Sequence, residues 1–284
     1  RQGLTALYAA FRYLLVTVLS VALYLVGLFV LYRATGELSL SALADAIGAG
    51  ALEHRVVRSA GVLLFAGVAI RTALVPFHLW LPDAHAQAPH PVSALLSGLM
   101  LKAAFVALYR LTSLFAPFDF AGRLLFLAGL ASAVLGVLLA LSQQDVKRLL
   151  AFHSISQMGY IAAAAGAGAI AGAFYHALGH ALFKSLLFLI VGRYVALSGR
   201  RDIYAMGSAA AASPRGVLPA VLFVAGAAAI SGVPPFTGFV SKALIGAGMK
   251  GSFGYAALRF VSVCTAASFF KLGRIILPST SPTG

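Results

Sequence analysis

The sequence is poor in charge, and above all in negative charge. Only 10% of the 284 residues are charged, and seven acidic residues stand against 21 Lys and Arg. Soluble domains carry about a quarter charged residues, so an ordinary globular protein is excluded. We find no paired carboxylates, no nucleophile–base–acid arrangement and no nucleotide loop. A reaction centre within the chain is therefore not expected, and whether the chain serves a larger enzyme stays open.

Cysteine is also scarce, since Cys264 is the only one. This excludes a disulfide framework and a Cys-based metal site, and we expect neither a metal nor another cofactor. The N-terminus does not resemble a signal peptide, because Arg1 leads through an amphipathic stretch into a full-length span without a cleavage-like site. No Met precedes Arg1, which suggests a fragment of a longer chain.

Hydrophobic residues, in contrast, make up 61% of the chain, and the mean hydropathy is +0.96. This surplus predicts an all-α fold, a polytopic bundle of transmembrane helices with ~20 residues per crossing. The first crossing is free of charge and lies between Arg12 and Arg33. We expect one transmembrane domain, residues 1–284, with eight crossings. They are placed at 13–32, 59–78, 92–115, 124–143, 149–169, 171–197, 216–247 and 253–275.

The net charge of +14 is distributed as membrane topology requires, not as a nucleic-acid surface. Most cations sit at the edges of apolar runs. With alternating crossings, the side of residue 1 carries Arg1, Arg12, Lys147, Arg148, Arg193, Arg200, Arg201, Arg215, Lys271 and Arg274. The other side carries Arg33, Arg55, Arg58, Arg110, Arg123 and Lys250. The excess predicts that the residue-1 side lies in the cytoplasm. We expect a multi-pass protein of the cell (inner) membrane.

Two crossings contain helix breakers together with a cation. The second has Arg71 and Pro76 and runs into a Pro-rich link, residues 81–91; the seventh has Pro234 and Pro235, followed by Lys242. Proline removes a backbone donor and clashes with the preceding turn, so each helix should break there. A pair of broken helices in separate halves of a chain indicates a transport site, although a simple kink is the alternative.

Ionisable side chains also lie in the middle of crossings. Lys102 is halfway along the third, and His176, His180 and Lys184 are spaced four residues apart in the sixth, so that they share one helical stripe. Imidazole takes and gives protons near neutral pH, and burial makes a lysine easier to deprotonate. The stripe therefore suggests a proton wire. Structural hydrogen bonding and a metal or haem site are the alternatives.

Weaker candidates surround this stripe. The polar groups of the fifth crossing, His153, Ser154, Ser156 and Gln157, could hold water or bridge helices. His78 and His85 flank the first broken helix as anchors or gates. Asp145 stands at the start of the fifth crossing, where we expect a solvated cap. No acid is placed inside a crossing.

Four sequence blocks resemble a known family in the same order along nearly the whole chain. They are Val75–His85 with the adjoining Ala88–Leu96, Asp145–Tyr160, Phe174–Lys184 and Gly232–Lys242. They are similar to the signatures of antiporter-like membrane subunits, which occur in respiratory complex I, Mrp-type cation/proton antiporters and membrane-bound hydrogenases.

The resemblance implies two inverted five-helix repeats, each with a discontinuous helix, and a midplane line of buried charges that moves protons, with Na⁺ coupling left open. The positions that match the family's relay are Lys102, Lys147, His176, His180, Lys184 and Lys242. They are called the relay residues below. The resemblance also implies other membrane subunits as partners.

The sequence departs from the family pattern at two points. Arg71 stands where the family has a lysine on the first broken helix, and arginine does not deprotonate in proteins. The family's partner glutamate would precede residue 1, so that the chain would correspond to the family's sixth to thirteenth helices. We expect a charge shift at Arg71 to alter the proton affinity of Lys102 and so bias the relay.

Three other functions remain open. The chain could be the membrane subunit of an inorganic-carbon uptake complex, in which case a zinc-bearing peripheral protein would co-purify. It could be a haem-binding electron carrier that uses His176 or His180 together with His153, which an absorption spectrum would reveal. It could also be a passive scaffold that lost pumping with the Lys-to-Arg change.

Overall fold

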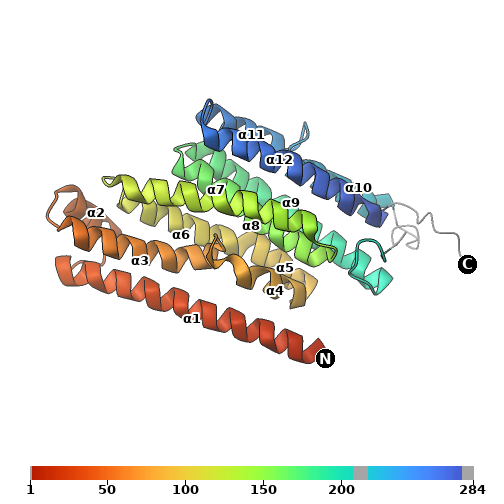
Figure 1. Cartoon of the computed structure of the whole chain (residues 1–284), viewed down its shortest axis with the longest axis horizontal. Coiled ribbons are helices and arrows are strands. Elements are labelled where there is room, and N and C mark those ends of the chain that lie inside the picture. Colours follow the sequence, from red (N-terminus) through yellow and green to blue (C-terminus); the bar gives the residue numbers. More distant parts are fainter. Residues whose placement is uncertain (1, 207–216, 277–284) are drawn as a thin grey trace, which may run out of the picture.

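The chain is a bundle of helices that lie nearly side by side along the long axis of the molecule (Figure 1). The computed structural model describes residues 2–206 and 217–276. Within these ranges an isolated bridge between Asp145 and Asp202 is the only strand-like pairing, which confirms the all-α prediction. Arg1 and Arg215, which entered the charge comparison, and residue 216 of the seventh predicted crossing lie outside the described residues.

The helices follow one another in an up-and-down order (Figure 1). Their bounds are α1 Gln2–Thr35, α2 Leu40–Gly48, α3 His54–Thr72, α4 Trp80–Gln87, α5 His90–Leu95, α6 Leu101–Leu114, α7 Asp119–Ser142, α8 Val146–Gly166, α9 Ile170–Ser198, α10 Val217–Ser231, α11 Thr237–Gly248 and α12 Phe253–Leu272. The segment between the first two predicted crossings, residues 33–58, contains a short helix, α2.

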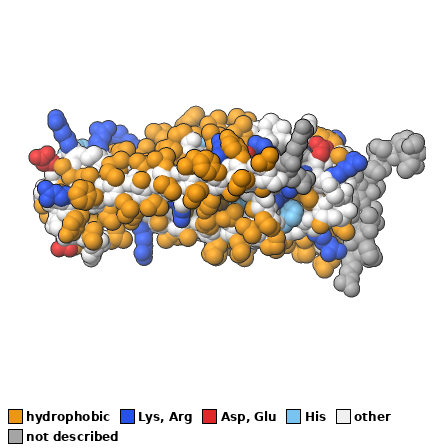
Figure 2. Space-filling view, turned by 90° about the horizontal axis from the view of Figure 1, so that it is seen from below, with side chains coloured by type: hydrophobic (Ala, Val, Ile, Leu, Met, Phe, Trp, Pro, Cys, Tyr) orange, Lys and Arg blue, Asp and Glu red, His pale blue; other side chains and the backbone are white. Residues whose placement is uncertain are grey.

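Six helical stretches of the described chain are long and apolar enough to cross a membrane. They are Gly3–Thr35, His54–Gln87, His90–Leu114, Asp119–Ser142, Ile170–Ser198 and Phe253–Ile276. The chain is therefore a multi-pass membrane protein. Because α8 is rich in polar side chains and α10 has only 15 residues, the count of eight crossings stays a prediction, as does the inverted repeat. Figure 2 shows apolar side chains over most of the middle of one face, with several Lys and Arg side chains at each end.

The first discontinuous helix breaks over residues 73–76, a segment that includes Pro76, as the sequence predicted. Helix α3 ends at Thr72, Ala73 takes a left-handed conformation with φ 56°, and a 3₁₀ turn over Phe77–Leu79 leads into α4. The Pro-rich segment predicted as a link is therefore largely helix α4. Pro82 fits because it lies in the first turn, where a helix has no use for the missing N–H.

Helix α4 also corrects the expectation that crossings contain no acid. Asp83 lies on α4, within the predicted span His54–Gln87. It accepts a hydrogen bond of 2.6 Å from Arg12 of α1, and Arg148 of α8 approaches it to 3.7 Å. The acid is tolerated because it is paired and still 24% exposed near the helix end.

The second discontinuous helix is confirmed. Helix α10 ends at Ser231 and α11 begins at Thr237. Gly232 adopts φ 83°, a conformation that favours glycine. A Cβ on Gly238 would stand 1.7 Å from the carbonyl oxygen of Ala229, so only glycine permits α11 to approach α10 this closely. The peptide bonds Val75–Pro76 and Pro234–Pro235, one in each break, are cis.

Helix α8 forms the centre of the bundle. Nearly all its side chains are buried, and its closest neighbour is α7. A Cβ on Gly159 of α8 would lie 2.3 Å from the backbone nitrogen of Ala133 of α7. A Cβ on Gly129 of α7 would lie 2.3 Å from the backbone nitrogen of Ala163 of α8. Small residues let two backbones approach in a membrane, where packing and not the hydrophobic effect joins helices. The polar groups of α8 are thereby held in the interior.

Candidate functional site

The relay residues of α9 lie together as predicted. His176, His180 and Lys184 are all 0% exposed, and their spacing places them on successive turns of one face. Successive members of such a row stand about 6 Å apart, a gap that one water molecule can bridge. This face is covered by α6, α8 and α11, each of which contributes a polar partner.

Lys102 meets the middle of this row. It follows a π-helical turn, Leu96–Met100 (η2), and its Nζ donates to the carbonyl oxygen of Ser97 and hydrogen-bonds to Nδ1 of His180. Turns of this kind occur frequently at functional sites. An amine and an imidazole in direct contact can exchange one proton.

His176 connects the row to the second broken helix. Its Nδ1 lies 2.7 Å from Oγ of Ser241 on α11, and its Nε2 lies 2.9 Å from Oε1 of Gln157 on α8. Ser241 in turn donates to the carbonyl oxygen of Gly238 at 3.1 Å. An imidazole held at both nitrogens keeps its place when its protonation changes.

Lys242, the neighbour of Ser241, sits at the break itself. Its Nζ donates to the carbonyl oxygens of Ile230 (2.9 Å) and Ser231 (3.2 Å) at the end of α10. These carbonyls have lost their helical partners because the helix stops there, and the negative end of a helix dipole favours a cation. Lys242 also lies 5.7 Å from the centre of the Tyr160 ring. Pro234 and Pro235 belong to the same break.

The other two lysines have different surroundings. Lys184 donates to the carbonyl oxygen of Leu150 at 2.5 Å and lies 5.2 Å from the ring centre of Phe188. Lys147 begins α8 and donates to the carbonyl oxygen of Ala88, beyond the end of α4. It is 1% exposed but shares no hydrogen bond with another relay residue. The geometry joins Lys102, His180 and His176 closely and leaves Lys147 apart.

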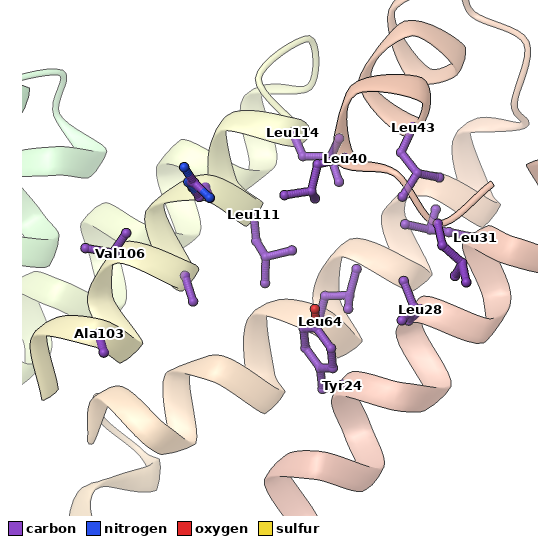
Figure 3. Close-up of a pocket in the computed structure, with 13 residues that line it drawn as sticks. Tyr24, Leu28, Leu31, Leu40, Leu43, Leu64, Ala103, Val106, Leu111 and Leu114 are labelled. Atoms are coloured by element: carbon purple, nitrogen blue, oxygen red, sulfur yellow. The ribbon is translucent and has the colours of Figure 1, made fainter. Parts of the chain in front are cut away.

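Arg71 ends α3, directly before the break that includes Pro76. In the described part of the chain it has no hydrogen bond or ion pair, and it lines a cavity of about 340 Å³ with Ser20, Tyr24 and Met100. A second cavity of about 360 Å³ shares Tyr24 with the first and extends between α1, α2, α3 and α6 (Figure 3). Its lining is mostly leucine and alanine, with Arg110 as its one charged group.

Several polar contacts were not singled out by sequence reasoning. Ser241 links His176 to the second break, Ser97 lies 2.9 Å from Ser154, and Nε2 of His153 lies 2.8 Å from Oγ of Ser268. Serine is common in membrane helices, so it gave no signal of its own. Its position next to Lys242 could have pointed to Ser241. The cap at Asp145 is confirmed, since its carboxylate accepts the backbone N–H groups of Lys147 and Arg148.

Comparisons with known proteins match this architecture. Residues 1–270 fit the family described as NADH:quinone oxidoreductase/Mrp antiporter, TM. NADH-quinone oxidoreductase subunit N of Desulforudis audaxviator is 35% identical over 95% of this chain and 55% of its own length. A Na(+)/H(+) antiporter subunit of Alkalihalophilus pseudofirmus is 35% identical over 81% of this chain and 47% of its own length.

Solved structures give the same result. A chain in the Mrp complex from Dietzia sp. superimposes with a TM-score of 0.88 at 30% identity, over 98% of this chain and 52% of that one. The chain thus spans about half the length of the relatives that it matches. With a family match over nearly its whole length and the fold of an Mrp subunit, the chain belongs to the antiporter-like membrane subunits of the complex I and Mrp type.

Proposed function

We propose that the chain translocates protons through a midplane relay of buried lysine and histidine side chains. The observation that supports this most strongly is the connection from Lys102 to His180 and, one turn away, from His176 to Ser241, the neighbour of Lys242. It joins α6, which follows the first broken crossing, to α11, the helix after the second break. A structural role alone would not require titratable groups at Lys102, His180, His176 and Lys242.

The cost of these groups points in the same direction. An ionised lysine at the centre of a crossing costs about 2.5–3.5 kcal/mol on insertion scales. Lys102, Lys184 and Lys242 each offset part of this cost with backbone carbonyls, and none of the three has a carboxylate partner in the described chain. An amine without a fixed counter-ion changes its protonation state readily when a neighbouring charge moves.

The proposed mechanism is electrostatic. A charge shift near Arg71 alters the proton affinity of Lys102, which exchanges a proton with His180. The proton continues through His176 and Ser241 to Lys242, and Lys184 provides a further site on the same face. A difference of one pKa unit corresponds to about 1.4 kcal/mol, so modest movements of charge suffice to load and release protons.

The ion and the assembly belong to the same proposal. Relatives are named as subunits of a Na(+)/H(+) antiporter and of NADH-quinone oxidoreductase, which favours H⁺ as the transported ion, with Na⁺ coupling open, and other membrane subunits as partners. We place the complex in the cell (inner) membrane with residue 1 towards the cytoplasm.

The test is proton flux in vesicles that contain the full-length chain in its complex. We expect Lys242→Ala and Lys184→Ala to abolish transport while the complex still assembles, with Lys250→Ala, an exposed lysine, as the matched control. Wild-type flux in both variants would overturn the proposal. If the wild type and both variants all show no proton flux, the result favours the passive scaffold.

The haem alternative fits His176 poorly, because both of its ring nitrogens are engaged. Nδ1 of His180 contacts Lys102, but Nε2 of His180 has no hydrogen-bond partner in the described chain, so a haem at His180 stays a prediction. Axial ligation by His176 would break one of its two hydrogen bonds. The inorganic-carbon alternative stays a prediction, and a co-purifying zinc-bearing peripheral protein would favour it.

A further inference from the structure

His85 is a buried imidazole outside the relay. It lies on α4, it is 0% exposed, and neither of its ring nitrogens has a hydrogen-bond partner in the described chain. Buried polar groups in proteins are almost always hydrogen-bonded, to protein or to water. An imidazole always carries at least one N–H group that needs a hydrogen-bond acceptor, so we infer that water reaches this position.

The inner neighbour of His85 is Lys184. The imidazole stacks on the ring of Phe188 with 4.8 Å between ring centres and 18° between planes, and the same ring lies 5.2 Å from Nζ of Lys184. Phe188 thus contacts a relay residue and His85 together. The cationic groups whose fields act on His85 are Lys184, Lys147 and Lys102.

On its outer side His85 approaches the end of α4. The carbonyl oxygen of Ala86, the next residue, accepts a hydrogen bond from Nη1 of Arg201 at 2.8 Å, and one turn further on that of Ala88 accepts one from Nζ of Lys147. Gln87 and Pro89, in the same turn, are exposed. The end of α4 therefore has polar groups that lie between the interior and the membrane surface.

One more buried polar atom lies next to this end of α4. Nδ1 of His90 has no hydrogen-bond partner among the described residues. A Cβ on Gly192 would come within 2.4 Å of the His90 ring, so this imidazole lies directly against α9. Three unpartnered polar atoms, two on His85 and one on His90, indicate water at the end of α4 better than a single one would.

We propose that His85, with Lys147 and the water around them, forms an access branch through which protons pass between Lys184 and the membrane surface at the end of α4. The branch rests on the proposed function, because it supplies protons to the relay. In the loading step a proton from the surface passes Lys147 and protonates the neutral imidazole of His85. The imidazolium then gives its proton through water to the neutral amine of Lys184, which leaves a neutral imidazole and an ammonium.

Two substitutions separate proton transfer from packing. His85→Phe keeps a ring against Phe188 and removes both nitrogens, whereas His85→Gln keeps hydrogen-bonding capacity but cannot titrate. The matched control is His54→Phe, an exposed histidine in edge contact with Phe118 at 5.0 Å. All variants are measured as the full-length chain in its complex, with assembly checked by co-purification.

We expect both His85 variants to lose proton flux about tenfold or more, as removal of a general acid–base group commonly does, and His54→Phe to stay within about twofold of wild type. The pH dependence of the remaining flux should change when the pH is varied at the end of α4 and not at the opposite side. A merely structural role would not produce this one-sided change.

Three results would overturn the branch. Wild-type flux in both His85 variants, while Lys184→Ala is inactive, would refute the branch and leave the relay intact. Normal flux in His85→Gln with loss in His85→Phe would show that hydrogen bonding suffices without titration. Absence of flux in the wild type would remove the proposed function and the branch together.

Discussion

Replacing Lys102 by methionine separates the stability of the fold from its transport activity. The amine of Lys102 contacts the carbonyl oxygen of Ser97 and Nδ1 of His180. Methionine has a similar length and no charge, so it fills the same space without either hydrogen bond. We expect Lys102→Met to leave stability nearly unchanged and to abolish proton flux.

The expected stability change follows from two opposing effects. Loss of the amine leaves a buried ring nitrogen of His180 without its partner, which costs about 1–3 kcal/mol. Removal of a partly buried charge gains a similar amount, since replacing buried charges by well-packed apolar groups is often neutral or stabilising by about 1–4 kcal/mol. The net change should lie within about 2 kcal/mol of zero.

The assay pairs thermal unfolding of the detergent-solubilised complex with proton flux in vesicles. Lys102→Arg is the informative second variant, because arginine keeps the charge but does not release its proton. We expect flux to fall about a hundredfold or more in both variants. Lys250→Met, at an exposed position, should have no effect. Wild-type flux in Lys102→Arg would refute proton transfer through this amine.

Three further predictions concern other parts of the bundle. Arg71→Lys should keep flux within about threefold, since it preserves the charge, whereas Arg71→Ala should lower it about tenfold in the same vesicle assay; equal flux in both would contradict an electrostatic role. Gly159→Val should lower the unfolding temperature by an amount that corresponds to about 3 kcal/mol or more, because even a Cβ would meet the Ala133 backbone at 2.3 Å; an unchanged transition would argue against this close packing. Asp83→Asn should cost about 1 kcal/mol, seen by the same unfolding measurement, because its ion pair with Arg12 is partly exposed; no loss in Asp83→Asn would mean that the pair contributes nothing.

The fold class and the broken helices could be predicted because they depend on composition and local chemistry. Apolar runs with few charges indicate membrane helices, and the prolines at 234 and 235 mark a break that the structure confirms. The first break lies at Pro76 as predicted, but the prediction of a link over residues 81–91 was wrong. The sequence cannot tell that Pro82 would stand in the first turn of a new helix, because this depends on where the chain restarts after Ala73.

The site was predicted only in part, for a similar reason. The stripe of His176, His180 and Lys184 depends on helical spacing alone, and the structure places all three on one buried face. The contact of Lys102 with His180 and that of Ser241 with His176 join helices far apart in the sequence. Such pairings depend on tertiary packing, which the spacing of residues along one helix does not predict.

The most direct test of the account is a map of the complex in a lipid membrane at a resolution that shows water molecules. We predict ordered water between His180 and His176, and between Ser241 and Lys242, so that a continuous hydrogen-bonded path joins Lys102 to Lys242. Dry apolar packing between the two imidazoles, or amines that turn away towards lipid headgroups, would contradict the claim that protons pass along this line.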